Sequence, residues 1–314
     1  MSAAPPSFGF PAGRAVVIGE ALVDVVHHRD GSVAEHPGGS PANVALGLAR
    51  LGREVELIAW LGKDAHGEAV AAHLESSGVT IAPASWGAAS TSLAIATLDA
   101  SMQAAYEFDL EWALSPDANL GESPLVVHTG SIAAVLEPGA TAVAKLLREA
   151  KGTATVTYDP NARPSLMGEP ANALAYVETM IGLSDVVKVS DEDIAWLTGA
   201  SPDDIAPRWI ALGARLVVVT RGGDGASAYL ADGRRIDVSA QRVDVVDTVG
   251  AGDSFMGGLI DGLWSAGLLG AESREALGTI PESTLRSILE RCARIAAITV
   301  SRAGANPPTS AELS

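Results

Sequence analysis

Residues 245–255 read Val-Val-Asp-Thr-Val-Gly-Ala-Gly-Asp-Ser-Phe, and this stretch indicates the fold more strongly than any other. β-Branched residues lead up to Asp247, and apolar residues beyond Asp253 recur at the spacing of one helix face. The pattern predicts a buried strand that ends at Asp247, a loop of small residues, and a helix with Asp253 in its first turn.

The same stretch has the chemistry of a phosphoryl-transfer site. Small residues at Gly250, Ala251 and Gly252 leave backbone amides open to an anion, and the start of a helix adds positive partial charge. We therefore predict an anion hole at these three residues and a catalytic base at Asp253. The alternative is a structural corner in which the glycines serve only the turn and Asp253 only caps the helix.

Composition limits the class of protein. The chain has 314 residues, 47% apolar content and a formal net charge of −17. Such an apolar content supports a large core, whereas the charge opposes binding to nucleic acid or to an anionic membrane. No apolar run approaches the roughly 18 residues of a membrane helix, and residues 1–13 lack a signal-peptide pattern and are expected to form a flexible tail. The lone Cys292 is expected to be buried, which favours a cytoplasmic location.

Short apolar segments alternate with helical segments along most of the chain. The predicted strands are 15–18, 55–60, 125–128, 154–158, 185–189 and 216–220. The predicted helices include 41–51, 140–150 and 171–182. This alternation is typical of parallel strands that are covered by helices on both faces.

Two segments interrupt that pattern. Residues 24–36 and about 90–110 have alternating β-type sequences, with turn residues at Asp30-Gly31 and Asp99-Ala100. We expect them to form a small sheet that stands off the main one, and we interpret it as a lid over the site. The alternative is a dimer-forming surface. The sequence thus predicts one α/β domain over 14–314 with an inserted lid.

Further short motifs accompany the first one. Gly38 and Gly39 precede a helix start, Ser-Pro-Ala-Asn, where glycines would let a ligand approach the backbone and Asn43 would face it. Other motifs lie at 19–24 (Gly-Glu-Ala-Leu-Val-Asp), 159–163 (Asp-Pro-Asn-Ala-Arg) and 219–225 (Val-Thr-Arg-Gly-Gly-Asp-Gly). Each is a weak signal alone, but their combination and order are informative.

Over about 15–307 the chain resembles the ribokinase-like, or PfkB-type, carbohydrate kinases, and it contains both signatures of that family. The resemblance implies an α/β fold with a Rossmann-like, mostly parallel central sheet flanked by helices and a small inserted β-sheet lid. It also implies ATP as the phosphoryl donor, Mg²⁺ as the metal and a sugar hydroxyl as the acceptor. The motifs at 19–24, 37–43 and 159–163 are most similar to those of fructokinases.

The resemblance also implies roles for individual residues. Asp253 matches the catalytic base, and Gly250, Ala251 and Gly252 match the anion hole. The implied sugar contacts are Asp24, Gly38, Gly39, Asn43, Asp159 and Arg163. The implied ATP contacts are Lys188, Ser190, Thr220, Gly222 and Gly225. A carboxylate such as Asp24 suits a sugar because it can accept two hydroxyl protons. The structural alternatives are a turn carboxylate for Asp24, an edge-strand lysine for Lys188 and an ordinary glycine-rich hairpin for 220–225.

The chain departs from the family pattern at one place. Where many members have Asn-x-x-Glu, it has Ser190-Asp191-Glu192-Asp193, and the shorter Asp193 is expected to reach Mg²⁺ through water. The alternative is a plain helix start with Ser190 as N-cap and favourable acids in the first turn. Activation by a monovalent cation such as K⁺, known in the family, would involve Asp247 and carbonyls near 249 and 301–304.

We predict ATP-dependent phosphorylation of a sugar primary hydroxyl, with fructose as the first candidate. 2-Keto-3-deoxygluconate kinase, ribokinase and nucleoside kinase are alternatives within the enzyme class, and a non-catalytic sugar-sensing protein is the alternative outside it. Asp253 argues against a sensor, which needs no base. The chain lacks a P-loop motif and a dinucleotide fingerprint after its first strand. The expected partners are the sugar, ATP and a second copy of the chain bound through the lid.

Overall fold

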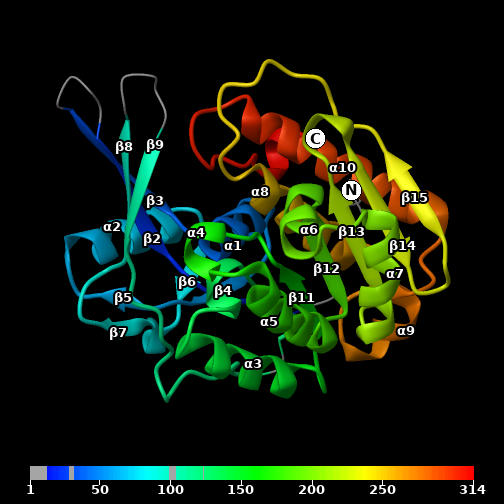
Figure 1. Ribbon diagram of the computed structural model, residues 1–314, viewed down its shortest axis with the longest axis horizontal. Coiled ribbons are helices and arrows are strands. Elements are labelled where there is room, and N and C mark those ends of the chain that lie inside the picture. The colour runs from blue at the N-terminus through cyan, green and yellow to red at the C-terminus, as the bar shows by residue number, and fades with distance from the viewer. Residues whose placement is uncertain (1–12, 28–31, 99–103, 123) are drawn as a thin grey trace, which may run out of the picture.

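The computed structural model describes residues 13–27, 32–98, 104–122 and 124–314. A large sheet with helices on both faces forms its body, and a smaller sheet stands to one side (Figure 1). This arrangement confirms the predicted mostly parallel α/β fold with a small separate sheet. The predicted tail falls on 1–12 apart from Gly13, and the turns Asp30-Gly31 and Asp99-Ala100 also lie outside the described residues.

The large sheet has nine strands. In spatial order they are β15 (Arg235–Val238), β14 (Ala226–Leu230), β13 (Leu216–Thr220), β12 (Val186–Ser190), β11 (Thr155–Asp159), β10 (Val126–Gly130), β1 (Ala15–Ile18), β4 (Val55–Ile58) and β6 (Val79–Ile81). In this spatial order, all the strands from β13 across to β6 are parallel to one another. β14 and β15 continue the sheet as antiparallel strands. The predicted strands in this sheet agree with the observed ones to within two residues at each end.

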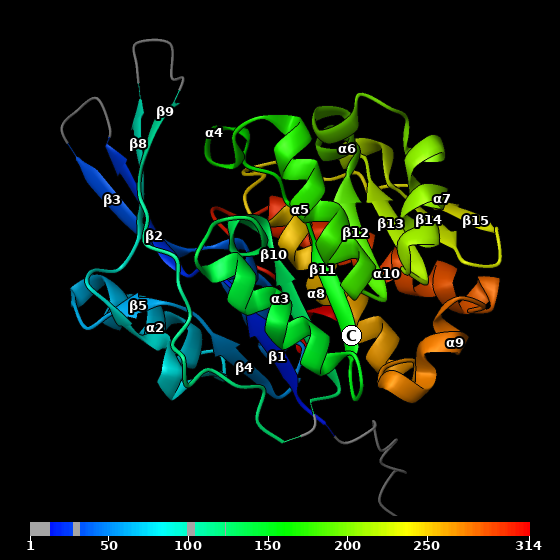
Figure 2. The ribbon, with the colours of Figure 1, turned by 60° about the horizontal axis from the view of Figure 1, so that its bottom comes forward.

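Successive side chains of the interior strands enter two separate cores. In β13, Leu216 and Val218 pack into one core, whereas Val217 and Val219 pack into the other. The first core is covered by α1 (Ser40–Arg50), α2 (Ala65–Glu75), α8 (Ala251–Ser265) and α10 (Glu282–Val300). The second core is covered by α3 (Gly139–Ala150), α5 (Pro170–Leu183), α6 (Asp191–Thr198) and α7 (Pro202–Leu212). Figure 2 shows α3 and α5 in front of the sheet and α10 behind it. Burial on both faces explains why these strands read as continuous apolar runs.

The small sheet joins the two segments that interrupt the α/β alternation. Its strands, in order, are β3 (Val33–Gly38), β2 (Leu22–His27), β8 (Leu93–Leu98) and β9 (Ala104–Asp109). β2 and β8 are parallel, and the two outer pairs are antiparallel. Shorter elements complete the chain: β5 (Leu61–Gly62), β7 (Trp86–Ala88), α4 (Pro164–Met167) and α9 (Arg274–Leu277). Among the described residues, no helix combines the length and apolarity needed to cross a membrane.

The prediction of a strand that ends at Asp247 is wrong. Residues 239–249 form no strand, and Val245 and Val246 are 62% and 65% exposed. The amides of Val246 and Asp247 instead donate to the Val300 carbonyl at the end of α10, at 2.8 and 3.1 Å. β-Branched residues favour a strand only where a neighbouring strand and a core face are available, and this segment has neither.

The strand order also determines where a ligand site can form. After β1 the chain moves to β4 and β6 on one side, and β10 then returns to the other side of β1. Connections that leave adjacent parallel strands in opposite directions open a crevice at the carboxyl ends of those strands. Here the crevice lies beyond Ile18 of β1 and Gly130 of β10.

One buried ion cluster fastens α8 to its neighbours. The Asp261 side chain is only 3% exposed, and Arg53 Nε donates to its Oδ1 at 2.6 Å. Arg291 of α10 donates to its Oδ2. The Arg53 guanidinium also lies 5.0 Å from the ring centroid of Trp264. A single carboxylate thus links α8, α10 and the segment after α1.

We expect Asp261→Ala to lower the free energy of unfolding by about 3 kcal/mol, because it removes the shared counter-ion of two guanidinium groups at a buried position. Asp232→Ala is the matched control, since Asp232 pairs with Arg234 on the surface and its removal should change stability little. Urea denaturation followed by circular dichroism measures both. Equal losses in the two variants would contradict the assignment.

Candidate active site

A cavity of about 810 Å³ occupies the crevice at the carboxyl ends of β1 and β10. The small sheet, the start of α1, the segment after β11 and the start of α8 all contribute to its wall. Residues 303–305, beyond the end of α10, close another side. The wall of the cavity is therefore formed by segments that are far apart in sequence.

Asp253 lies buried in this cavity and accepts hydrogen bonds on both carboxylate oxygens. Ser40 Oγ donates to Oδ1 at 2.7 Å, and Asn161 Nδ2 donates to the same oxygen at 3.2 Å. Asn43 Nδ2 donates to Oδ2 at 2.9 Å. These contacts fix the carboxylate, while its remaining lone pairs can accept a proton from a ligand hydroxyl.

The start of α8 lies beside that carboxylate. Gly250 has a left-handed backbone, with φ of 74°, and residues 250–253 line the cavity. The first amides of a helix have no carbonyl partner within it, so Gly252 and Asp253 present N–H groups at this end. A side chain at position 250 is excluded, because a Cβ there would lie 2.6 Å from Cβ of Ala305. The geometry suits an anion held by backbone amides.

Asp24 faces the cavity from β2, opposite His36 of β3. A Cβ on Gly38 would lie 2.2 Å from Asp24 Oδ2, so a side chain at position 38 would displace this carboxylate. Burial raises the pKa of Asp24, and the charges of His36 and Arg163 oppose that change. A ligand that donates hydroxyl protons would supply partners for this carboxylate.

Arg163 also lines the cavity, at the end of the segment that follows β11. Its Nη1 donates to Asn161 Oδ1 at 2.7 Å and to the carbonyls of Asn161 and Ala162 at 3.0 Å. Asn161 itself has a positive φ of 36°. Arg163 thus stabilises the unusual turn that brings the Asn161 amide to Asp253.

Asp159 and Lys188 lie behind the cavity and do not line it. Lys188 Nζ is 2.7 Å from Asp159 Oδ2, and both side chains are buried in the interior of the sheet. The edge-strand alternative for Lys188 is therefore wrong. Burial raises the pKa of Asp159 to about 7 against the pull of Lys188. The predicted contacts of Asp159 with a sugar and of Lys188 with ATP stay predictions, since neither residue lines this cavity. A Cβ on Gly252 would lie 3.0 Å from Lys188 Nζ, so the lysine ammonium lies close to the start of α8.

The predicted nucleotide contacts lie further along the same sheet edge. Ser190 and Thr220 are register partners at the ends of β12 and β13. Gly222 and Gly225 follow with φ of 47° and 96°, and a Cβ on Gly225 would lie 2.1 Å from the Val238 carbonyl oxygen. None of these residues lines the cavity around Asp253, which fits a donor bound beside the acceptor rather than within its pocket.

Ser190 is the N-cap of α6, as the structural alternative states: its Oγ accepts from the Asp193 amide at 3.0 Å. Asp193 Oδ1 in turn accepts from the Ala162 amide at 3.1 Å. In the described part of the chain no three acidic, His or Cys side chains gather into a metal cage. The predicted contact of Asp193 with Mg²⁺ through water stays a prediction.

Asp247 connects two loops at the cavity rim. Its Oδ1 accepts from the Val249 amide at 3.0 Å and its Oδ2 from the Gly304 amide at 2.8 Å. The monovalent-cation site that the family resemblance suggests at these segments stays a prediction.

Sequence reasoning gave no role to several residues of the cavity, among them Glu20, Ser40 and Asn161. Each of these three lies inside a motif that was recognised, but no local signal says which side chains will meet Asp253. Ser40 and Asn161 are separated from Asp253 by 213 and 92 residues. Only one sequence signal could have pointed to these residues: each is a polar residue just after a predicted parallel strand or at the start of a helix.

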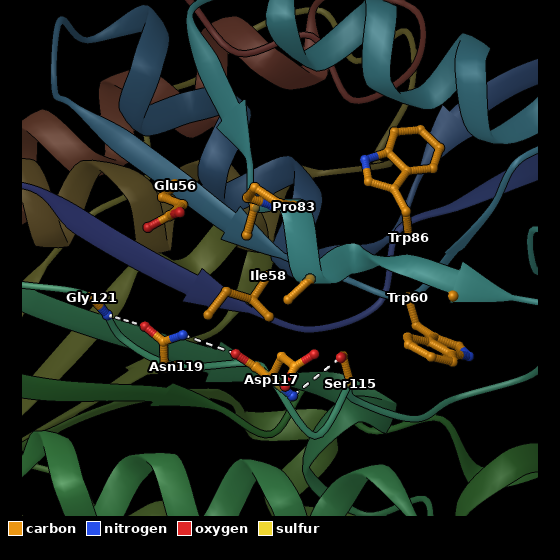
Figure 3. A pocket seen from close by; sticks show the side chains of 12 residues that line it. Glu56, Ile58, Trp60, Pro83, Trp86, Ser115, Asp117, Asn119 and Gly121 are labelled. Atoms are coloured by element: carbon orange, nitrogen blue, oxygen red, sulfur yellow. Dashed lines mark hydrogen bonds between the residues drawn. The ribbon is translucent and has the colours of Figure 1, made fainter.

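A second hollow, of about 500 Å³, lies where 115–121 covers the β4–β6 edge of the sheet (Figure 3). Trp60, Trp86 and Glu56 line it. Hydrogen bonds connect Asp117 with Ser115 and Asn119 within its covering loop. It contains none of the predicted site residues, so the cavity around Asp253 is the candidate active site.

Comparison with known proteins agrees with this geometry. Residues 13–312 match the family model described as pfkB family carbohydrate kinase. A fructokinase of Rhizobium leguminosarum bv. trifolii is 34% identical over 284 residues, which cover 86% of this chain and 84% of the relative. The crystal structure of a Xylella fastidiosa fructokinase with bound ATP superposes with a TM-score of 0.81 at 25% identity, covering 96% of each chain. A fructokinase double mutant of Vibrio cholerae O395, bound to fructose, ADP and potassium, gives 0.79 at 27% identity, covering 96% of this chain and 97% of the other.

We expect Gly39→Ala to destabilise the protein by about 2 kcal/mol more than Gly52→Ala, because only the first change creates an overlap. Both glycines have positive φ, 103° and 89°, but a Cβ on Gly39 would lie 2.4 Å from the Glu20 carbonyl oxygen while Gly52 has nothing within 4 Å. Chemical denaturation of the two variants checks this difference. Similar losses would mean that the backbone conformation alone sets the cost.

Proposed function

Because the chain belongs to the pfkB family of carbohydrate kinases, we propose that it phosphorylates a primary hydroxyl of fructose with ATP as donor. The observation that supports this most directly is the Asp253 carboxylate, held by Ser40, Asn43 and Asn161 beside the free amides of α8. A base next to an anion site is what phosphoryl transfer to an alcohol needs. The choice of fructose rests on the relatives, several of which are fructokinases.

The reaction can be derived from this arrangement. The sugar hydroxyl gives its proton to Asp253 as its oxygen attacks the γ-phosphorus in line. A bond forms between that oxygen and phosphorus, the bond to the β–γ bridging oxygen breaks, and ADP leaves. The predicted anion hole at Gly250, Ala251 and Gly252, together with the amide of Asp253, would stabilise the negative charge of the equatorial oxygens.

The sugar would bind between the small sheet and the start of α1. We assign its hydroxyls to Asp24 and Asn43, with Gly38 and Gly39 giving close access to the backbone and Arg163 at the mouth of the pocket. In support, all five residues line the cavity, and the half-buried Asp24 carboxylate can accept two hydroxyl protons.

ATP would lie along the ends of β12 and β13, over Ser190, Thr220, Gly222 and Gly225. Mg²⁺ bound to the phosphates would neutralise part of their charge, and it usually retains several waters in such sites. Asp193 fits a water-mediated contact with that ion, since the Ala162 amide occupies only its Oδ1. Asp247 and the neighbouring carbonyls would hold K⁺, which a related fructokinase contains.

We interpret the small sheet as a lid that excludes water during transfer, since Asp24, Ala94 and Phe108 from its strands line the cavity. A homodimer through the lid is the arrangement we favour, because Val33 on its edge strand β3 is 51% exposed. The cytoplasm, with its ATP, is the expected location, in agreement with the buried free thiol of Cys292.

Two alternatives are kept for the test. A 2-keto-3-deoxy sugar acid would need a cation for its carboxylate, and Arg163 lies at the cavity for that purpose. A sugar-sensing protein would bind fructose without turnover, but it would not need a carboxylate fixed by three donors beside an anion site.

We expect Asp253→Asn to lower kcat by at least about 100-fold, because it removes the proton acceptor, while the KM values for sugar and ATP stay within about tenfold. Coupled ADP assays measure this effect. Asp244→Asn, on the exposed segment before the motif, is the control and should keep normal turnover. Near-normal kcat in Asp253→Asn would refute the mechanism.

In a panel of acceptors at saturating Mg-ATP, kcat/KM for D-fructose should exceed the values for ribose, 2-keto-3-deoxygluconate and adenosine by roughly tenfold or more, because a polar site rejects analogues that leave its groups unpaired. Assays with and without K⁺ test the cation at the same time. A better acid or nucleoside substrate would overturn fructose but keep the kinase. Binding without ADP formation for every sugar would favour the sensor.

A further inference from the structure

Glu20 is a cavity residue to which the proposed function gives no part. It follows β1 at the crevice between β1 and β10, its side chain is 6% exposed, and it lines the cavity. Its Oε2 has no hydrogen-bond partner among the described residues. A buried carboxyl oxygen without a partner costs free energy, so it calls for a partner that arrives with a ligand.

The surroundings of Glu20 come from three other elements. The Ser131 hydroxyl, after β10, interacts with the carboxyl group, and Ser131 has a positive φ of 53°. Arg163, before α4, is the nearby cation, and Asp253 of α8 is the nearby anion. Burial outweighs these influences and raises the pKa of Glu20 to about 7. Near neutral pH the group is therefore present both as a donor and as an acceptor.

A sugar hydroxyl fits such a group because it can donate or accept. We propose that Glu20 contacts the acceptor sugar, its Oε2 forming a hydrogen bond with a hydroxyl other than the one that Asp253 deprotonates. The inference rests on the sugar-binding role proposed for this cavity. Unlike Asp24, which the small sheet supplies, Glu20 is anchored to the central sheet, so it selects among sugars from the fixed side of the pocket.

The contact has a consequence for pH dependence. A sugar that fills the cavity excludes water and so disfavours the ionised carboxylate, which also lies near Asp253. The neutral form, dominant below the raised pKa, should bind better. The sugar KM should therefore rise as the pH rises through about 7. Fructose does not titrate in this range, which makes the effect attributable to the protein.

The test combines variants of Glu20 with analogues of the sugar. Glu20→Gln keeps the shape and a donor, Glu20→Met removes both hydrogen-bonding functions, and Glu149→Gln on the exposed face of α3 is the matched control. KM and kcat are measured for D-fructose and for a set of deoxy analogues, each lacking one hydroxyl. Glu20→Met should raise the fructose KM roughly tenfold, and Glu20→Gln about threefold or less.

The decisive readout is additivity. For the analogue that lacks the paired hydroxyl, Glu20→Met should cause no further loss, whereas its effect should persist with the other analogues. In Glu20→Gln, the pH dependence of the sugar KM should disappear. Additive losses with every analogue, or an unchanged pH profile in Glu20→Gln, would overturn the contact and leave a purely structural role.

Two outcomes need separate treatment. If Glu20→Met does not fold, Glu20→Gln against the wild type over the same analogues and pH range decides the question. If the wild type phosphorylates another sugar in place of fructose, the fructose assignment fails on its own, and the same cycle with deoxy analogues of that sugar tests Glu20.

Discussion

The hydrogen bonds that converge on Asp253 are the constraint on which the site depends. Ser40 and Asn43 come from the start of α1 and Asn161 from the segment after β11, so two distant parts of the chain must meet the carboxylate of a third. The crossover between β1 and β10 makes that meeting possible. The glycines around it follow from lack of space, since Gly38 borders the Asp24 carboxylate and Gly250 borders Ala305.

The sequence prediction was accurate where burial alone determines the structure, and it failed where the structure depends on contacts between distant residues. Interior strands such as 216–220 were predictable, because burial on both faces leaves an unmistakable apolar run. Val245 and Val246 led to a wrong prediction of a strand, because strand preference reflects packing partners that this segment lacks. The family motifs brought Asp24, Asn43, Arg163 and Asp253 to one cavity. Side chains that act only through distant contacts, Ser40 and Asn161 among them, could not be deduced from local patterns.

The cavity is acidic, although its proposed task is to bring a sugar to a polyanion. Glu20, Asp24, Asp247 and Asp253 line it, against Arg163 and His36. In a chain with a net charge of −17, attraction for phosphate must therefore be local. The first amides of α8 meet that need because their partial charge is fixed by the backbone and does not depend on titration. Carboxylates remain available for hydroxyls.

The buried pair of Asp159 and Lys188 has an evolutionary consequence. Loss of either partner alone leaves an unpaired ionisable group inside the sheet, which is far more costly than replacing both by apolar residues. Single changes at these positions should therefore be removed by selection, while paired changes can persist. Positions 159 and 188 lie in neighbouring strands but are separated in sequence. We expect their residues to be conserved together or replaced together among the relatives of this protein.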